Sequence, residues 1–388
     1  MTMANAPAAL AIAPDPIQRF LSWVIDEALP CWAPRDDDAP LPFAERRGFD
    51  GERKDPGFIR LRVVARQVAV YAQAAAAGYR GYHAAAERGW QALVRYYWEA
   101  GEGWIARVNR RGEPVDREFG LYDQAFALYA CACWARASGS TLAVALAERT
   151  LILIDRRLGQ SGQPGWRSIS DATGRDQNSH MHFLEALLAL DRVAPGHAVE
   201  RGITALLQLA EHQLFDAASG CIKERFDDRW RALPGQAGVE PGHQYEWVWL
   251  LASARERGFA SALPAGRLFA FAQRHGWSTA TGLIHDHCHA DGTPSSRDHR
   301  LWPHCEAIRA ASVHADRVEG RQLAERAASR LLAIFLTTDF SGGWIDRVDA
   351  GYRPIVDHVP ASSLYHLWEA AKALVTAGWP VSGKAGPC

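Results

Sequence analysis

The amino-acid sequence predicts an all-α protein, an (α/α)6 barrel with short β-hairpins at the mouth of its active site. Three observations lead to this prediction. A Gly-rich, strand-like segment recurs about every 60 residues, two kinds of amphipathic helix alternate between its copies, and each inner helix carries one conspicuous polar residue. We therefore expect residues 15–379 to form one catalytic domain, between a disordered tail at residues 1–14 and a C-terminal tail at residues 380–388.

Composition and charge argue against several classes of protein. The chain has 388 residues and a formal net charge of -1, so it lacks the basic excess that nucleic-acid binding needs. No apolar run approaches the ~20 residues of a membrane helix, so we expect no membrane partner. The seven cysteines are odd in number and scattered, which fits a cytoplasmic protein without a disulfide framework. A homodimer is compatible with the sequence, which leaves the oligomeric state open.

The recurring segment has the pattern of a β-hairpin. Each copy begins at a glycine, and most copies are followed within a few residues by a second turn signal such as Arg111-Gly112 or Asp291-Gly292. The five copies begin at Gly101, Gly162, Gly220, Gly282 and Gly342.

Each interval between hairpins has room for two helices, one apolar on all sides and one apolar along a single stripe. The first kind is expected to form an inner ring, at about residues 58–77, 121–138, 178–193, 242–257, 302–318 and 361–377. The second kind is expected to form an outer ring, at about residues 15–29, 82–99, 141–158, 197–214, 264–275 and 320–337. An open solenoid of helix pairs would fit the hydrophobic pattern equally well.

The polar residues of the inner helices favour the closed ring. They are separated by 58 to 63 residues, so every repeat contributes one functional group at about the same phase. In a closed ring these groups would all point at one axis, which predicts a shared site. The six residues are Arg66, Gln124, His182, His243, Glu306 and His366.

Local patterns refine this site. Arg66 stands in an otherwise apolar helix, where a buried guanidinium needs an anion or a bound oxygen. His180 and His182 are two residues apart on one helix and so point to different faces; His182 is expected to face the axis. His243 and Glu246 are three residues apart and therefore adjacent on one helix face.

These motifs resemble the N-acylglucosamine 2-epimerase superfamily, which also contains cellobiose 2-epimerases, sulfoquinovose isomerase and D-mannose isomerases. The resemblance runs from about Arg60 to about Ala371. The segment Val-Pro-Ala-Ser-Ser-Leu-Tyr that precedes His366 is most similar to the mannose isomerase branch. The motifs that carry the resemblance are Pro-Gly-His243-x-x-Glu246-Trp, Met-His182-x-x-Glu185-Ala, Trp302-x-x-x-Glu306 and Tyr365-His366.

The resemblance implies an (α/α)6 barrel and assigns roles to four catalytic residues. His366 is expected to be the base for the C2 proton of a sugar, and His243 the acid and base for the ring oxygen and hydroxyls. Glu246 would orient His243, and Arg66 would stabilise the developing oxyanion. Six further residues are expected to bind substrate, the tryptophans by stacking: His182, Glu306, Trp302, Asn178, Gln124 and Trp104.

The expected reaction is isomerisation of D-mannose to D-fructose, with D-lyxose as a second substrate. It would proceed by ring opening and histidine-mediated proton transfer through a cis-enediolate. A non-catalytic sugar-binding scaffold would also fit the sequence, and two alternative reactions remain open. One is a 2-epimerase that acts on a free or N-acylated sugar or a disaccharide, and the other is an inverting glycoside hydrolase with Glu246 and Glu306 as its carboxylates. The sequence leaves the choice among mannose, lyxose and a substituted or phosphorylated hexose undecided.

The segment His285-Asp-His287-Cys-His289 resembles a metal site, since alternate strand positions would place its histidines on one face of a hairpin. Two-histidine proton transfer needs no metal. The hairpin is therefore expected to contact sugar or solvent, and neither metal nor cofactor is expected.

Overall fold

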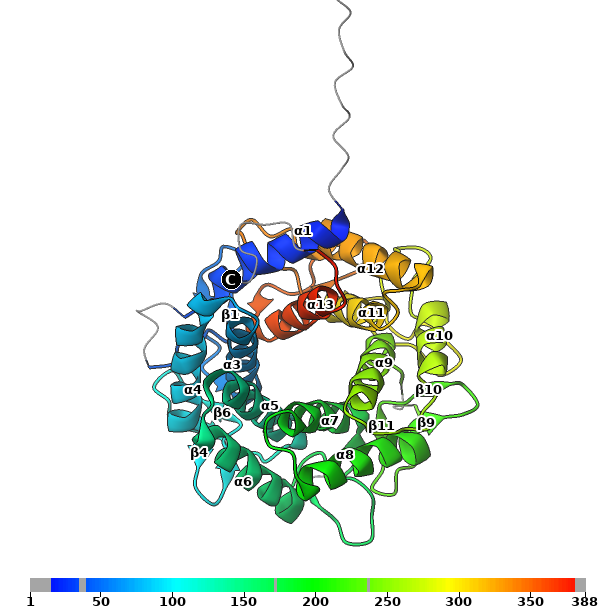
Figure 1. The fold of residues 1–388 in the computed structure, drawn as a ribbon. Helices are drawn as coiled ribbons and strands as arrows, with labels where there is room; N and C mark the ends of the chain where they lie inside the picture. Colours follow the sequence, from blue (N-terminus) through cyan, green and yellow to red (C-terminus); the bar gives the residue numbers. More distant parts are fainter. Residues whose placement is uncertain (1–14, 35–39, 171–172, 236–237, 381–388) are drawn as a thin grey trace, which may run out of the picture.

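The computed structural model describes residues 15–34, 40–170, 173–235 and 238–380. Most of both predicted tails lies outside these ranges. The described helices form two concentric rings around one axis (Figure 1). The inner ring consists of α3 (Leu61–Ala76), α5 (Leu121–Ser138), α7 (Gln177–Asp191), α9 (Pro241–Glu256), α11 (Trp302–Ser312) and α13 (Leu364–Thr376). The outer ring consists of α1 (Pro16–Ser22), α4 (His83–Tyr97), α6 (Thr141–Leu158), α8 (His197–Leu209), α10 (Ala265–His275) and α12 (Val318–Arg330).

The inner ring is closed. Each inner helix packs against the next along the chain, and α13 packs against α3, so the last repeat contacts the first. This arrangement confirms the (α/α)6 barrel and excludes the open solenoid. It also explains the two kinds of helix, because α5 is buried on almost every side, whereas the outer helix α6 buries one stripe.

Polar caps and special backbone residues set where the helices begin and end. Asp176 accepts a hydrogen bond from the backbone N–H of Ser179 at the start of α7, and Ser140 does the same for Ala143 at the start of α6. Gly139 has φ 72° and ends α5 in a left-handed conformation. These features place the boundaries of the middle repeats close to those expected.

Several helix ends differ from the expectation. Three outer helices pass into π-helical turns: α1 into η1 (Trp23–Ala28), α8 into η3 (Ala210–Leu214) and α12 into η4 (Leu331–Phe335). A π turn holds more residues than an α turn, and hydrophobic periodicity does not reveal the change. The remaining short helices are α2 (Leu29–Trp32) and the 3-10 turns η2 (Arg80–Tyr82) and η5 (Ala361–Ser363).

Short strands join neighbouring repeats at the N-terminal ends of the inner helices. Antiparallel pairs link β3 (Ile59–Arg60) to β6 (Arg107–Val108), β8 (Arg175–Asp176) to β11 (Arg225–Phe226), and β12 (His299–Arg300) to β13 (Arg347–Val348). The pair of β1 (Arg46–Arg47) and β14 (Val359–Pro360) joins the first repeat to the last. The remaining pairs lie within a repeat: β1 with β2 (Arg53–Lys54), β4 (Trp98–Glu99) with β5 (Gly103–Trp104), β6 with β7 (Pro114–Asp116), and β9 (Phe215–Asp216) with β10 (Cys221–Ile222).

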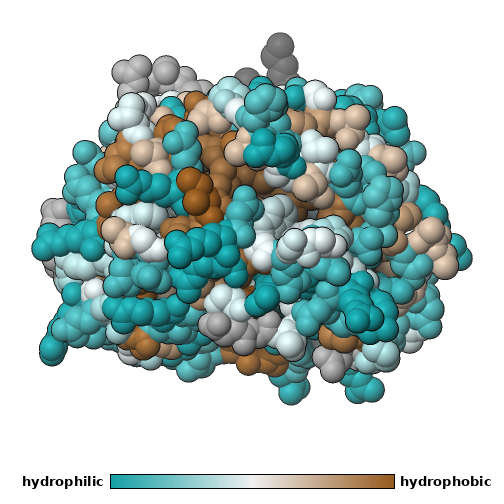
Figure 2. Space-filling view, turned by 90° about the horizontal axis from the view of Figure 1, so that it is seen from below, coloured by the Kyte–Doolittle hydropathy of each residue, from teal (hydrophilic) through white to brown (hydrophobic). Residues whose placement is uncertain are grey.

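One side of the ring is covered mainly by hydrophilic residues, with a few hydrophobic residues showing in a hollow between them (Figure 2). This surface is the polar face that the striped outer helices leave exposed. Among the described helices, none combines the length and the apolar character needed to cross a membrane.

Candidate active site

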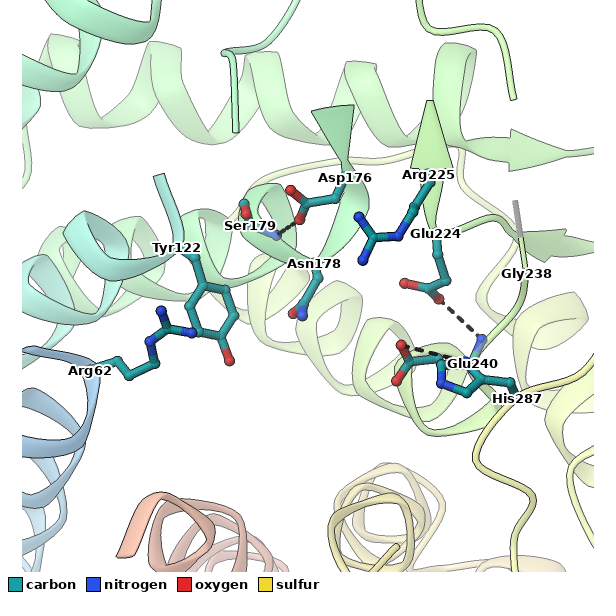
Figure 3. A pocket seen from close by; sticks show the side chains of 10 residues that line it. All are labelled: Arg62, Tyr122, Asp176, Asn178, Ser179, Glu224, Arg225, Gly238, Glu240 and His287. Carbon is teal, nitrogen blue, oxygen red and sulfur yellow. Dashed lines mark hydrogen bonds and ion pairs between the residues drawn. The ribbon is translucent and has the colours of Figure 1, made fainter. Parts of the chain in front are cut away.

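A cavity of about 360 Å³ lies at the mouth of the barrel. Its wall is formed by the first turns of the inner helices α3, α5 and α7, the residue before α9, and the loops beside them (Figure 3). The side chains that line it are polar or charged: Arg62, Tyr122, Asp176, Asn178, Ser179, Glu224, Arg225, Glu240 and His287, with Gly238 completing the wall.

The predicted catalytic residues lie one helical turn below this rim. Arg66 follows Arg62 by four residues on α3, and His182 follows Asn178 by four residues on α7. Four residues advance an α-helix by about one turn on the same face, so the cavity opens onto these deeper side chains. Of the sequence-predicted residues, the structure brings together at this depth Arg66, His182, His243, Trp302, Glu306 and His366, with Asn178 in the cavity wall.

Arg66 is a buried cation that lacks a carboxylate partner among the described residues. Its side chain is 5% exposed, and Nη2 donates a hydrogen bond to the hydroxyl of Tyr122 at 2.7 Å. The guanidinium lies 4.1 Å from the ring centre of Phe126 and 4.9 Å from that of Tyr365. Its Nε has no hydrogen-bond partner. An aromatic cage holds this charge without neutralising it, which leaves it available to an anionic oxygen.

His243 lies among carboxylates. Its Nδ1 is 3.0 Å from Oε2 of Glu224 and 3.8 Å from Oε2 of Glu240. Gln177 donates to the same carboxylate of Glu224 and holds it in place. Burial alone would lower the pKa of His243, but the negative charges of Glu224 and Glu240 raise it to about 10. The imidazole is therefore a cation at neutral pH and can donate a proton.

His366 lies in the opposite electrostatic environment. Its Nδ1 is 2.7 Å from Oε1 of Glu306, and its side chain is 9% exposed. Burial and the positive charge of Arg66 lower the pKa of His366 well below its ordinary value. The imidazole is therefore neutral at neutral pH, and a proton on Nδ1 leaves the lone pair of Nε2 free to act as a base.

The indole of Trp302 contacts both histidines. Its ring centre is 4.8 Å from that of His243 and 5.5 Å from that of His366. This packing depends on Gly242, because a Cβ at that position would lie 2.5 Å from the indole of Trp302. The glycine of the Pro-Gly-His motif thus has a steric role, which is to let α9 approach Trp302 closely.

Glu246, which the sequence predicts to orient His243, lies near it, and its charge contributes to the raised pKa of His243, but its carboxylate points elsewhere. Its Oε1 is 3.4 Å from Nη1 of Arg309 and 3.7 Å from Nδ1 of His182, and it makes no described hydrogen bond to His243. The residue that orients His243 is Glu224, from the loop before α9. Positions three residues apart share a helix face, but here the imidazole turns toward the loop and the carboxylate toward the axis.

Gln124 does not join the central cluster either. Its side chain is fully buried, and its amide bonds the backbone N–H and carbonyl of Trp104 at 3.4 and 2.9 Å. Trp104 is itself 2% exposed, and its indole donates to Thr150. Neither residue faces the cavity. Both belong instead to the contact between a hairpin and the following inner helix, so the structure does not support them as sugar ligands.

Three other residues repeat this contact around the ring. His180 accepts from the backbone N–H of Trp166, Gln244 bonds the backbone of Ile222, and His304 accepts from the N–H of Ile284. Their spacing along the chain resembles that of the axial residues, so two periodic series run through the inner helices. One series faces the axis, and the other holds the hairpins.

Sequence reasoning missed the residues contributed by loops. Glu224 and Glu240 control the charge of His243, and Arg225 lines the cavity (Figure 3). These residues lie outside the periodic helix pattern, which therefore gave no signal for them. Tyr122 shares a helix face with Phe126, and its position at the start of an inner helix could have indicated it.

The three histidines of the suspected metal segment do not converge. The side chain of His287 is 41% exposed and lines the cavity, His289 points to solvent, and His285 packs against the ring of His299. Three described clusters bring potential ligand atoms within 4.8 Å: His182 with Glu185 and Glu246, Glu224 with Glu240 and His243, and Glu240 with Asp286 and His287. Each cluster contains either a protonated histidine or a carboxylate that is already ion-paired with an arginine. We therefore assign no metal to them.

The chain is similar to several known sugar isomerases and epimerases. A mannose-6-phosphate isomerase of Rhizobium meliloti is 33% identical over 371 residues, which cover 85% of this chain and 92% of that protein. A cellobiose 2-epimerase of Bacteroides fragilis is 26% identical over 60% of this chain and 64% of that protein. A solved D-mannose isomerase superposes with a TM-score of 0.83 over 94% of this chain and all of its own, at 21% identity.

The family model described as N-acylglucosamine 2-epimerase matches residues 47–370, which span every inner helix from α3 to α11 and the first half of α13. The match contains Arg66, His182, His243 and His366. The chain therefore belongs to the N-acylglucosamine 2-epimerase family.

Proposed function

We propose that the protein is an aldose–ketose isomerase that converts D-mannose to D-fructose and accepts D-lyxose as a second substrate. One observation carries this proposal: two histidines in opposite protonation states flank Trp302 beside the uncompensated guanidinium of Arg66. Groups whose environments push their pKa values apart identify an acid and a base.

His243 serves the ring-opening step. As a cation it donates a proton to the ring oxygen while the carboxylate of Glu240 takes the proton of the anomeric hydroxyl, which breaks the bond between C1 and the ring oxygen and leaves a C1 carbonyl. Glu224 accepts from the imidazole at 3.0 Å and Glu240 forms an ion pair with it at 3.8 Å; both line the cavity, where their carboxylates would bind sugar hydroxyls. The open-chain aldose then has a C1 carbonyl that makes the C2 proton acidic.

His366 serves the proton transfer. Its Nε2 takes the C2 proton, the electrons of that bond form the C1–C2 double bond, and the carbonyl electrons move to O1. Arg66 stabilises this anion, an interaction worth roughly 3–4 kcal/mol for one well-placed donor. His366 then returns the proton to C1 while the O2 proton moves to O1, which gives the ketose.

The charges around the cavity favour an unphosphorylated sugar. Three carboxylates line it, those of Asp176, Glu224 and Glu240, against the guanidinium groups of Arg62 and Arg225. Arg62 is already paired with both oxygens of Asp123, at 2.8 and 3.0 Å. A dianionic phosphate would lack the concentrated positive charge that such groups require.

The two alternative reactions fit less well. An inverting hydrolase needs carboxylates ~6.5–9.5 Å apart with water between them. Glu246 and Glu306 instead share Nη1 of Arg309, at 3.4 and 2.9 Å, and a guanidinium fills the space between them. A 2-epimerase would use the same two histidines and differ in where the proton returns. The cytoplasmic location, the homodimer and the absence of metal and cofactor remain predictions.

The test is to incubate the protein with mannose, fructose, glucose, lyxose and mannose 6-phosphate in D2O and to follow products by NMR. We expect mannose and fructose to interconvert, lyxose to react more slowly and the phosphate to be inert. Faster turnover of mannose 6-phosphate than of mannose would overturn the assignment of a neutral substrate. Release of a shorter sugar from an oligosaccharide would favour the hydrolase.

Isotope transfer then separates isomerase from epimerase. With [2-²H]mannose, one base that serves both carbons should leave part of the deuterium at C1 of fructose. Glucose that carries solvent hydrogen at C2 would be consistent with proton transfer by the two histidines but would make the enzyme a 2-epimerase. Full retention of the label together with loss of activity in a chelator would indicate a hydride shift at a metal and contradict the two-histidine mechanism.

A further inference from the structure

A fully buried arginine lies below the histidines, at the floor of the site. Arg309 follows Glu306 by three residues on α11 and is 0% exposed, so it touches neither the cavity nor solvent. Its Nη1 donates to Oε2 of Glu306 at 2.9 Å, and its Nη2 donates to Oε1 of Glu185 at 2.8 Å. Glu246 at 3.4 Å and Glu369 at 3.8 Å complete a ring of four carboxylates from four inner helices.

Two of these carboxylates also hold the imidazoles of the site. Glu306 uses its other oxygen, Oε1, to contact Nδ1 of His366 at 2.7 Å. Glu185 uses its other oxygen, Oε2, to contact Nδ1 of His182 at 3.1 Å. Arg309 is therefore two hydrogen bonds away from each histidine, and each link runs through one carboxylate that it shares with that histidine.

We infer that Arg309 is a positioning residue that keeps Glu306 and Glu185 as acceptors, so that the proton of His366 stays on Nδ1 and Nε2 remains free to take the C2 proton. This inference rests on the proposed isomerase function. Without the guanidinium, four buried carboxylates would face one another, and some of them would be protonated. A protonated Glu306 would donate to Nδ1 of His366, which moves the imidazole proton to Nε2 and blocks the base.

The ionisation of Glu306 supports this role. Burial raises the pKa of Glu306 to about 7, and Arg309 is the largest influence that opposes the rise. Burial would raise the pKa of Glu185 as well, but Arg309 and the bond to His182 hold it below its ordinary value. The other charged or titratable groups that face this network are Arg66, Tyr129, His182, His243, Glu246, Arg300, Tyr365, Glu369 and Lys372. None of the cations in this set makes a described hydrogen bond or ion pair with Glu306, so none of them can replace Arg309 there.

The test compares Arg309→Met and Arg309→Lys with Arg257→Met as a matched control. Arg257 is bonded to the buried carboxylate of Asp191 at 2.7 Å, at the far end of α9 from the cavity. We expect Arg309→Met to lower kcat by about 10²-fold with KM changed less than about twofold, because the lost residue acts on the base and not on the sugar. Arg309→Lys, which keeps one charge but not the fork, should lose about tenfold.

The pH profile separates positioning from mere stabilisation. Removing the cation raises the proton affinity of the pair formed by Glu306 and His366, so the acid limb of kcat should move about one pH unit higher in Arg309→Met. It should move less in Arg309→Lys and not at all in Arg257→Met, although the control also loses thermal stability. Folded Arg309 variants with the wild-type pH profile would overturn the inference.

A second readout does not need turnover. Long-range ¹H–¹⁵N spectra of histidine-labelled protein report which ring nitrogen of His366 carries the proton, with His366→Gln used to assign the signal. We expect Nδ1–H in the wild type and Nε2–H in Arg309→Met. An unchanged tautomer would contradict the positioning role even if no sugar were turned over. If no sugar were turned over but the tautomer of His366 changed as expected, the proposed function would be refuted and the inference would stand.

Discussion

His243 and His366 are the same residue type at similar positions on two inner helices, yet at neutral pH the first is protonated and the second is neutral. His243 faces the rim, where Glu224 and Glu240 stabilise its imidazolium. His366 faces Arg66 and the floor, where burial and positive charge stabilise its neutral form. Both rings pack against the indole of Trp302. Acid and base are therefore distinguished mainly by neighbours from other elements, although Glu240, three residues before His243, comes from the local sequence.

Replacing either histidine should have the largest effect. We expect His366→Ala and His243→Ala each to lower kcat by about 10²–10⁴-fold, the usual contribution of general acid–base catalysis. Both side chains face the site, so circular dichroism and Tm should stay close to wild type. His197→Ala, at a side chain that is 93% exposed, is the control and should be neutral. More than about a tenth of wild-type activity in either variant would remove that histidine from the mechanism.

The two limbs of the pH profile should report the two histidines separately. An unperturbed imidazole would lose activity below about pH 6.5. The lowered pKa of His366 keeps its imidazole neutral below that value, but its partner Glu306 has a pKa raised to about 7, so we expect the acid limb of the pair near neutral pH, with the alkaline limb set by His243, whose pKa is raised to about 10. Plots of kcat/KM against pH would show a plateau between these two limbs. A rate that rises steadily toward pH 5 would instead indicate a carboxylate base.

Glu224→Gln should weaken the contrast between the histidines. It removes the charge that most raises the pKa of His243, so the imidazolium should lose its proton at lower pH and the alkaline limb should move down. We expect about a tenfold loss of kcat/KM above neutral pH and a smaller loss below it. Glu211→Gln, in a carboxylate that bonds Ser261 outside the site, serves as the control. An alkaline limb that stays in place would show that Glu224 does not set the charge of His243.

Gly242→Ala should test the packing between the histidines. Its Cβ would lie 2.5 Å from the indole of Trp302, so the indole or α9 must shift. A displacement of this size near the chemistry can cost up to about 10²-fold, and we expect a smaller loss, about tenfold, because one side chain can adjust. Trp302→Ala in the Gly242→Ala background should add little further loss if both changes act on the same contact. Fully additive losses would contradict this explanation.

Gln124→Ala should have the smallest effect on catalysis. The variant leaves a buried backbone carbonyl and N–H of Trp104 without partners, which costs about 1–3 kcal/mol of folding stability. We expect a lower Tm and a KM for mannose within about twofold of wild type. A large rise in KM with unchanged Tm would return Gln124 to the list of sugar ligands.

The sequence predicted the barrel and most of the axial residues because repetition carries that information. A period of about 60 residues implies equivalent positions, and equivalent positions on a closed ring converge. Repetition could not separate the two periodic series, so Gln124, which holds a hairpin, was grouped with Arg66 and His366, which face the axis. Only contacts between elements distinguish these positions.

Two further parts of the site lay beyond the pattern. Glu224 comes from an irregular loop, whose path in space has no sequence periodicity. Arg309 did have a signal in the sequence. It stands three residues after Glu306 on a helix that is expected to be buried, and a buried charge needs an ion-pair partner. The local sequence around Arg309 could not show that three carboxylates from other helices also surround it. The different protonation states of the two histidines therefore emerged only from the assembled structure.

The ring places the N-terminal ends of all the described inner helices at the mouth of the barrel. Each such end carries roughly half a positive charge from the helix dipole, so several partial charges surround the bound sugar without any mobile counterion. A neutral sugar gains little from this field, whereas an enediolate gains from every helix at once. Under the proposed mechanism the backbone itself would bind the intermediate more strongly than the substrate, which is the condition for catalysis. The carboxylates of Glu224 and Glu240 then have a second use: they screen this field locally, so that a protonated His243 can exist inside it.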